Sequence, residues 1–114
     1  MASYELYFYR TASGREEIVN FIEKLGDKTK ARIRNAFNLL KEYGLNLLGT
    51  AFVKKVNKEP ALFELRVVGD KQIRFLFMQY NKRSFIILSG FVKKSQKIPR
   101  KEIDKAIKRA REFL

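Results

Sequence analysis

Hydrophobic residues recur along this chain with two periods, and the change from one period to the other marks the expected elements. Residues 4–10 alternate between apolar and polar positions, which predicts a strand. Over residues 14–25 and 27–43 the apolar positions recur every three or four residues, which predicts two amphipathic helices. Because only a very short connection joins these helices, we expect an antiparallel helical hairpin that lies over one face of a sheet.

Residues typical of helix ends stand at the borders of both helical segments. Ser13 and Glu16 have the spacing of a capping box, which predicts the start of the first helix. Gly26 then marks its end, and Asp27 is a suitable N-cap for the second helix. Gly44 predicts the end of that second helix.

The second half of the chain predicts three consecutive antiparallel strands, at residues 62–68, 72–80 and 84–92, joined by short turns. Residues 45–61 lose the periodicity, which we interpret as a loop that contains a short strand-like piece. Pro99 suits the first turn of a final amphipathic helix. The sequence therefore predicts one α+β domain over all 114 residues. We expect an antiparallel sheet of about four strands, with the helical hairpin on one face and a C-terminal helix.

Two arginines lie inside the predicted strands, where apolar or neutral residues would be usual. If residues 69–71 form a three-residue loop, Arg66 falls directly opposite Arg74 on one face, whereas a two-residue turn would separate them onto opposite faces. Like charges in a cross-strand pair repel each other. The pair is tolerable on a well-solvated face, or if an anion such as phosphate lies between the guanidinium groups. Both interpretations stay open.

The composition adds a large positive charge and removes several kinds of chemistry. A formal net charge of +13 favours a polyanionic partner, most simply nucleic acid, with an anionic membrane surface or an acidic protein as alternatives. The absence of cysteine excludes disulfides and thiolate catalysis, and the absence of histidine removes the usual metal ligand and general base. We expect no metal and no cofactor. Without a secretory leader or a membrane-spanning stretch, a soluble cytoplasmic protein is expected.

Three sequence motifs are distinctive: LFELRV, then IRFLF, then LSGFVKKSQKIPRKEIDKAIKRA. Together with the order of the elements, they resemble the RelE/ParE toxin superfamily, and within it the HigB-type, phage-derived branch. In the last stretch, Ser95, Pro99, Glu102, Ile103 and Ala106 match the pattern of that branch. The resemblance implies a RelE-like fold and a toxin of a type II toxin-antitoxin pair. Such a toxin cleaves mRNA, typically on the translating ribosome, and is silenced by a helix-turn-helix, HigA-like antitoxin.

Metal-independent cleavage of RNA uses the 2′-hydroxyl of the substrate as nucleophile, so the protein must move protons and stabilise the phosphorane. A lysine can move a proton only if neighbouring cations lower its pKa from about 10.4 toward neutrality. We expect Arg66 and Arg74 to clamp the scissile phosphate and Lys93 to take or give the proton. Lys94 and Lys97 would help to hold the RNA backbone. Several members of the family that the chain resembles have a catalytic tyrosine near the C-terminus, whereas no tyrosine follows Tyr80 here. This departure from the family pattern disfavours a tyrosine-based mechanism.

The remaining lysines extend this basic surface, and their role has two interpretations. Lys54 and Lys55 border the predicted sheet and could line the mouth of an RNA-binding groove. The basic stretch after the last strand could instead bind the acidic antitoxin or ribosomal RNA without chemistry. Three classes of function therefore stay open: an mRNA endonuclease, a ParE-like toxin directed at gyrase, and a non-catalytic RNA-binding module.

Overall fold

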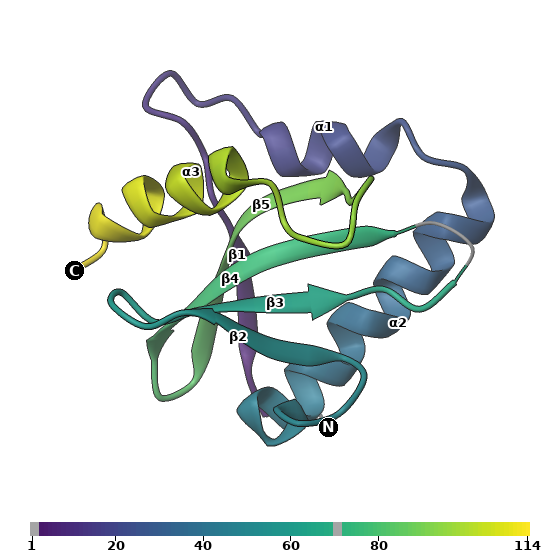
Figure 1. The fold of residues 1–114 in the computed structure, drawn as a ribbon, viewed down its shortest axis with the longest axis horizontal. Coiled ribbons are helices and arrows are strands. Elements are labelled where there is room, and N and C mark those ends of the chain that lie inside the picture. The colour runs from purple at the N-terminus through teal and green to yellow at the C-terminus, as the bar shows by residue number, and fades with distance from the viewer. Residues whose placement is uncertain (1–2, 70–71) are drawn as a thin grey trace.

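The computed structural model describes residues 3–69 and 72–114, and in these ranges five strands form a single sheet. Helices lie on both sides of that sheet (Figure 1). The first half contains β1 (Glu5–Phe8), α1 (Glu17–Glu23), α2 (Asp27–Tyr43), the 3₁₀ helix η1 (Gly44–Leu47) and β2 (Val53–Asn57). The second half contains β3 (Leu62–Arg66), β4 (Ile73–Asn81), β5 (Ser84–Val92) and α3 (Arg100–Arg111).

The sheet has the strand order β1-β5-β4-β3-β2, so the α+β class is confirmed and the expectation of about four antiparallel strands is corrected in two respects. First, the strand-like piece of the predicted loop is the edge strand β2, which pairs antiparallel with β3. The apolar pattern did not predict β2 as a full strand, because its residues are largely polar and an exposed edge strand need not show apolar alternation. Second, β1 pairs parallel with β5, a partner far away in the sequence.

The predicted hairpin register is confirmed on both sides of its turn. Arg66 pairs with Arg74, and the Val67 amide donates to the Ile73 carbonyl oxygen at 3.1 Å. The predicted three-residue loop at 69–71 itself lies partly outside the described residues. The register nevertheless places the two arginines on the same face of the sheet, because directly opposed residues share a face.

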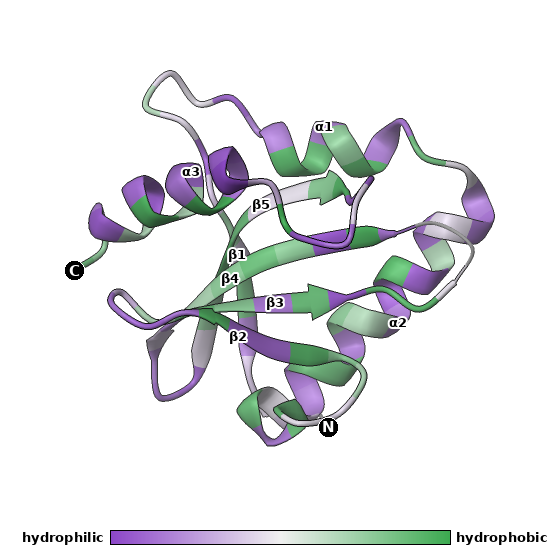
Figure 2. Cartoon of the chain, viewed as in Figure 1, coloured by the Kyte–Doolittle hydropathy of each residue, from purple (hydrophilic) through white to green (hydrophobic). Residues whose placement is uncertain are grey.

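One face of the sheet is covered by both α1 and α2, as predicted. The buried ring of Phe75 on β4 packs against Phe21 of α1, at 6.1 Å between ring centroids, and against Phe37 of α2, at 4.9 Å. The two helices diverge in a V from their connection instead of lying side by side as an antiparallel pair (Figure 1). Hydrophobic residues concentrate on the central strands and on the sheet-facing sides of the helices (Figure 2).

The opposite face is covered only in part, by α3. Ala106 and Ala110 are fully buried against β4 and β5. Arg109 connects α3 to the rest of the fold: it donates to the Leu88 carbonyl oxygen at 2.8 Å, pairs with Glu17 of α1 and lies 4.5 Å from the centroid of the Tyr9 ring. The part of this face over β2 and β3 is left open to a cleft.

The helix ends differ from the sequence expectations. The predicted capping box does not form: the Ser13 hydroxyl shares a hydrogen bond with the Thr11 hydroxyl at 3.1 Å, and α1 begins at Glu17 without a side-chain cap. Asp27 is the first residue of α2 and not its N-cap. Gly44 ends α2 with a positive φ of 55°, as predicted. None of the described helices combines the length and apolarity needed to cross a membrane.

Candidate RNA-binding cleft

An open cleft of about 360 Å³ lies where β2 and β3 meet the segment between β5 and α3. Three chain segments converge there because β2 is an edge strand, β3 adjoins it, and residues 93–98 follow the end of β5. Four of the lining residues are lysines and one is an arginine, so cations dominate the walls. The cleft is lined by Lys54, Lys55, Val56, Glu64, Arg66, Lys93, Gln96, Lys97, Ile98 and Ile103.

A buried carboxylate separates the two arginines of the predicted clamp. Glu64 lies two positions before Arg66 on β3, so both side chains point to the same face, and the Glu64 side chain is 1% exposed. Arg66 Nε donates to Glu64 Oε1 at 2.9 Å. Arg74 Nε lies 3.4 Å from Glu64 Oε2, an ion pair without hydrogen-bond geometry. The anion between the guanidinium groups is therefore supplied by the protein itself.

Arg74 is held by the protein more tightly than expected. Its Nη1 donates to the Ile73 carbonyl oxygen at 2.9 Å, and its Nη2 donates to Gln72 Oε1 at 2.8 Å. Burial lowers the pKa of Arg74, an effect that the charge of Glu64 opposes. Arg74 does not line the cleft, and its side chain is 13% exposed. The Arg74 side chain is therefore mostly buried, so a well-solvated face does not explain its position.

Arg66, in contrast, reaches the cleft with the far end of its guanidinium. Its side chain is 32% exposed, and only Nε is hydrogen bonded. Within the described ranges, Nη1 and Nη2 have no hydrogen-bond partner. Four N–H groups of Arg66 can thus bind an incoming anion, and a phosphate with two or more accessible oxygens suits this fork.

Four of the five predicted RNA-binding or proton-transferring lysines meet Arg66 in this cleft: Lys54, Lys55, Lys93 and Lys97. The Lys93 amide donates to the Gln72 carbonyl oxygen at 2.7 Å, which fixes the backbone just beyond β5. Lys94 is the exception, because it lines an adjoining cleft with Gln72, Ser95 and Gln96. The two clefts share Lys93 and Gln96, so the basic segment lies between them.

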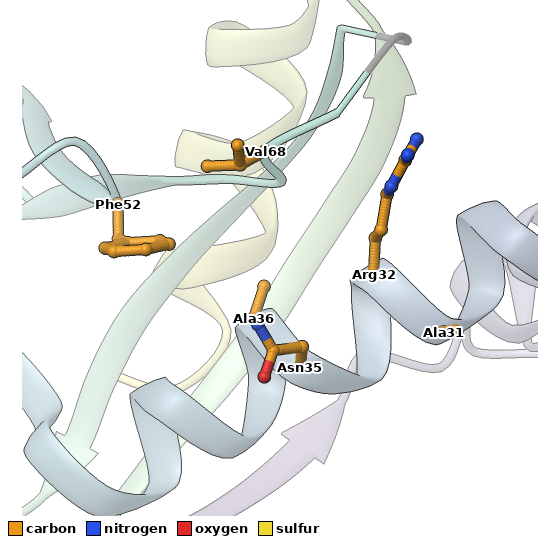
Figure 3. A pocket seen from close by; sticks show the side chains of 6 residues that line it. All are labelled: Ala31, Arg32, Asn35, Ala36, Phe52 and Val68. Atoms are coloured by element: carbon orange, nitrogen blue, oxygen red, sulfur yellow. The ribbon is translucent and has the colours of Figure 1, made fainter.

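A further pocket lies on the other side of the molecule, between α2 and two loop residues: Phe52, just before β2, and Val68, just after β3 (Figure 3). Its volume is about 200 Å³, and its walls combine Phe52 and Val68 with residues of α2. Ligand sites commonly measure about 300–1,000 Å³. It also contains none of the predicted site residues, so we assign no role to it.

Glu64 is the member of the site that sequence reasoning missed. Its two-residue spacing from Arg66 placed it on the same face, but only the structure shows that it is buried between both arginines. Within the described part of the chain, no group of three or more carboxylates is arranged to hold a metal ion. The chemistry available here is the binding of an anion by cations.

A half-open sheet with a cationic cleft defines a class of small basic α+β proteins suited to bind a polyanion. The family model described as phage derived protein Gp49-like (DUF891) matches residues 20–111, and the chain belongs to this family. It is a family of RelE-like, toxin-like proteins, associated with the toxins of toxin-antitoxin systems, so membership implies an antitoxin partner. No curated protein matches the chain significantly.

Proposed function

We propose that the protein is a HigB-type toxin that cleaves mRNA on the ribosome without a metal ion. The observation that carries this proposal is the cleft itself, in which the free end of Arg66 meets Lys54, Lys55, Lys93 and Lys97. Membership of the Gp49-like family supports the toxin class. A net charge of +13 supports an RNA partner, because each phosphate that the protein neutralises releases condensed counterions.

In the proposed reaction the 2′-oxygen of the RNA attacks the adjacent phosphorus while the bond from phosphorus to the 5′-oxygen breaks. The products are a 2′,3′-cyclic phosphate and a free 5′-hydroxyl. Arg66 binds the non-bridging oxygens, whose negative charge increases in the phosphorane. Lys93 removes the proton from the 2′-hydroxyl or returns one to the 5′-oxygen. Lys54, Lys55 and Lys97 hold neighbouring phosphates of the strand, as Lys94 does from the adjoining cleft.

Arg74 contributes its positive charge to the site, but it does not bind the phosphate directly. Its contacts with Gln72, Ile73 and Glu64 leave it outside the cleft. Its positive charge still lies on the same face as Arg66 and adds to the potential there. The role of direct phosphate ligand therefore falls to Arg66.

Expression of the chain in bacteria followed by mapping of mRNA 5′ ends tests this function. We expect growth inhibition with codon-phased cuts that leave 5′-hydroxyl ends. Arg66→Ala should abolish both effects, whereas Arg83→Ala, which removes the same charge from an exposed turn outside the cleft, should abolish neither. Growth inhibition with DNA damage and intact mRNA would instead indicate a gyrase-directed toxin. Salt-sensitive RNA binding without any cleavage would indicate a binding module.

The role of Lys93 is tested by Lys93→Arg in ribosomes programmed with a defined mRNA. Arginine keeps the positive charge, but it does not release its proton near neutral pH. We expect RNA binding to be retained and cleavage to fall by about 10²-fold or more, the range typical of a lost proton-transfer group. Unchanged cleavage by Lys93→Arg would remove Lys93 from the proton-transfer step.

A further inference from the structure

We infer that Glu64 is a positioning residue: its buried carboxylate fixes Arg66 so that both Nη groups face the cleft and bind one RNA phosphate in a defined orientation. The inference rests on the proposed function for its substrate, single-stranded RNA. Glu64 itself does not touch the reacting atoms. It acts through Arg66, and its own position is set by the sheet.

The first argument is the geometry of the guanidinium group. Arg66 has five N–H donors in a planar fork, and Glu64 Oε1 takes the one on Nε at 2.9 Å. Because a planar group held at its inner nitrogen can no longer turn freely, the outer edge is directed away from Glu64. The 32% exposure of the Arg66 side chain and its place in the cleft wall locate that edge at the cleft.

The second argument is the immobility of Glu64. Its side chain is 1% exposed, and its carboxylate lies between two guanidinium groups. The residue belongs to β3, which is paired on both sides, with Lys54 of β2 and Leu76 of β4 opposite Glu64. A short side chain on a central strand provides a more rigid support than any of the long cations around it.

The third argument is charge. Lys54, Arg66 and Arg74 all face Glu64, and Arg66 is the direct cross-strand partner of Arg74. Opposed like charges repel each other, so without the carboxylate the two guanidinium groups would be pushed apart. Glu64 allows both arginines to occupy one face and still leaves a net positive cleft. A merely solvated arginine pair would not need a buried counter-ion.

A double-mutant cycle on RNA binding tests this role. The probe is a short single-stranded RNA with 2′-O-methyl groups, which cannot be cleaved, and its Kd is measured by fluorescence anisotropy. We expect Arg66→Ala to weaken binding about tenfold in the natural chain, as for the loss of a charge-assisted hydrogen bond. In the Glu64→Gln background the same change should cost less than about threefold, because a neutral amide holds Arg66 more weakly and no longer offsets its repulsion by Arg74. Glu23→Gln, an exposed site with the same change of charge, should leave the tenfold effect intact.

Equal effects of Arg66→Ala in both backgrounds would overturn the inference, because Glu64 would then not act through Arg66. A merely structural role would lower the melting temperature and weaken binding without such coupling. If Glu64→Gln does not fold, the cycle is run with Glu64→Asp, which keeps the charge but shortens the reach by one methylene. A full tenfold effect of Arg66→Ala in the Glu64→Asp background would equally refute positioning.

Cleavage of mRNA on ribosomes separates this inference from the proposed function. Glu64→Gln should lower kcat at least tenfold, and a change confined to KM would overturn the inference. If the natural chain cuts no mRNA, the proposed nuclease function fails, and the binding cycle still decides the role of Glu64. If the natural chain does not bind the RNA probe at all, both proposals are overturned.

Discussion

Replacing Gly90 by alanine tests the packing that aligns β4 with β5. Gly90 is the cross-strand partner of Phe75, and a Cβ atom at Gly90 would lie 2.6 Å from Phe75 Cε1 and 2.8 Å from Cδ1. Phe75 is fully buried, and the rings of Phe21 and Phe37 already contact it. The Phe75 ring therefore has no free space to move into, and the strands themselves must shift.

Overpacking of this kind costs about 1–3 kcal/mol in the free energy of unfolding. For a chain of 114 residues, this corresponds to a fall in Tm of about 4–12 °C. The shift also reaches the cleft, because Arg74 precedes Phe75 on β4 and is the cross-strand partner of Arg66, which lines the cleft. We therefore expect Gly90→Ala to weaken RNA binding as well as to lower Tm.

Thermal unfolding followed by circular dichroism measures the effect. The matched control is Gly26→Ala, because a Cβ there meets nothing within 4 Å and Gly26 has a φ of −71° that alanine adopts freely. The control should change stability by less than about 1 kcal/mol. Phe75→Leu removes the clashing ring atoms, so it should cost less in the Gly90→Ala background than in the natural chain. An unchanged Tm for Gly90→Ala, or purely additive effects, would refute the packing argument.

Two further predictions concern the contacts that join α3 to the rest of the fold. The hydrogen bond from Arg109 lowers the pKa of the Glu17 carboxyl below its ordinary value of 4.5. The pair of Glu17 with Arg109 therefore stabilises the fold fully above about pH 4.5, and this stabilisation is lost as the pH falls through the lowered pKa. Below about pH 4.5, Tm should therefore fall more steeply for the natural chain than for Glu17→Gln, and parallel pH profiles would contradict this. Tyr9→Phe removes the hydrogen bond to Glu112, at 2.6 Å, and should cost about 1 kcal/mol in urea unfolding; an unchanged midpoint would contradict it.

Local sequence patterns predicted those parts of the fold that depend on neighbours in the chain. The run 84–92 has the bounds of β5, and the hairpin placed Arg66 opposite Arg74. Such features follow from alternation and turn length, which a single segment contains.

Features that depend on distant partners could not be predicted in this way. The parallel pairing of β1 with β5 joins segments that lie far apart in the sequence, and neither segment contains a pattern that identifies the other as its partner. Glu64 was visible as a neighbour of Arg66, but its burial depends on three strands together. The sequence therefore indicated a cationic face correctly, yet it left open whether the anion between the arginines was a ligand or part of the protein.

The parallel pairing of β1 with β5 also determines when the molecule can finish folding. During synthesis β1 leaves the ribosome before β5 and can pair only after β5 has followed, and Tyr9 can bond Glu112 only once that residue, 103 positions later, has been made. Contacts between such distant segments form slowly, because a long loop must close first. The cleft depends on residues up to 103, so it too is assembled only after the first residues of α3 have left the ribosome. A nascent chain thus has no finished cleft while the residues before α3 are being made.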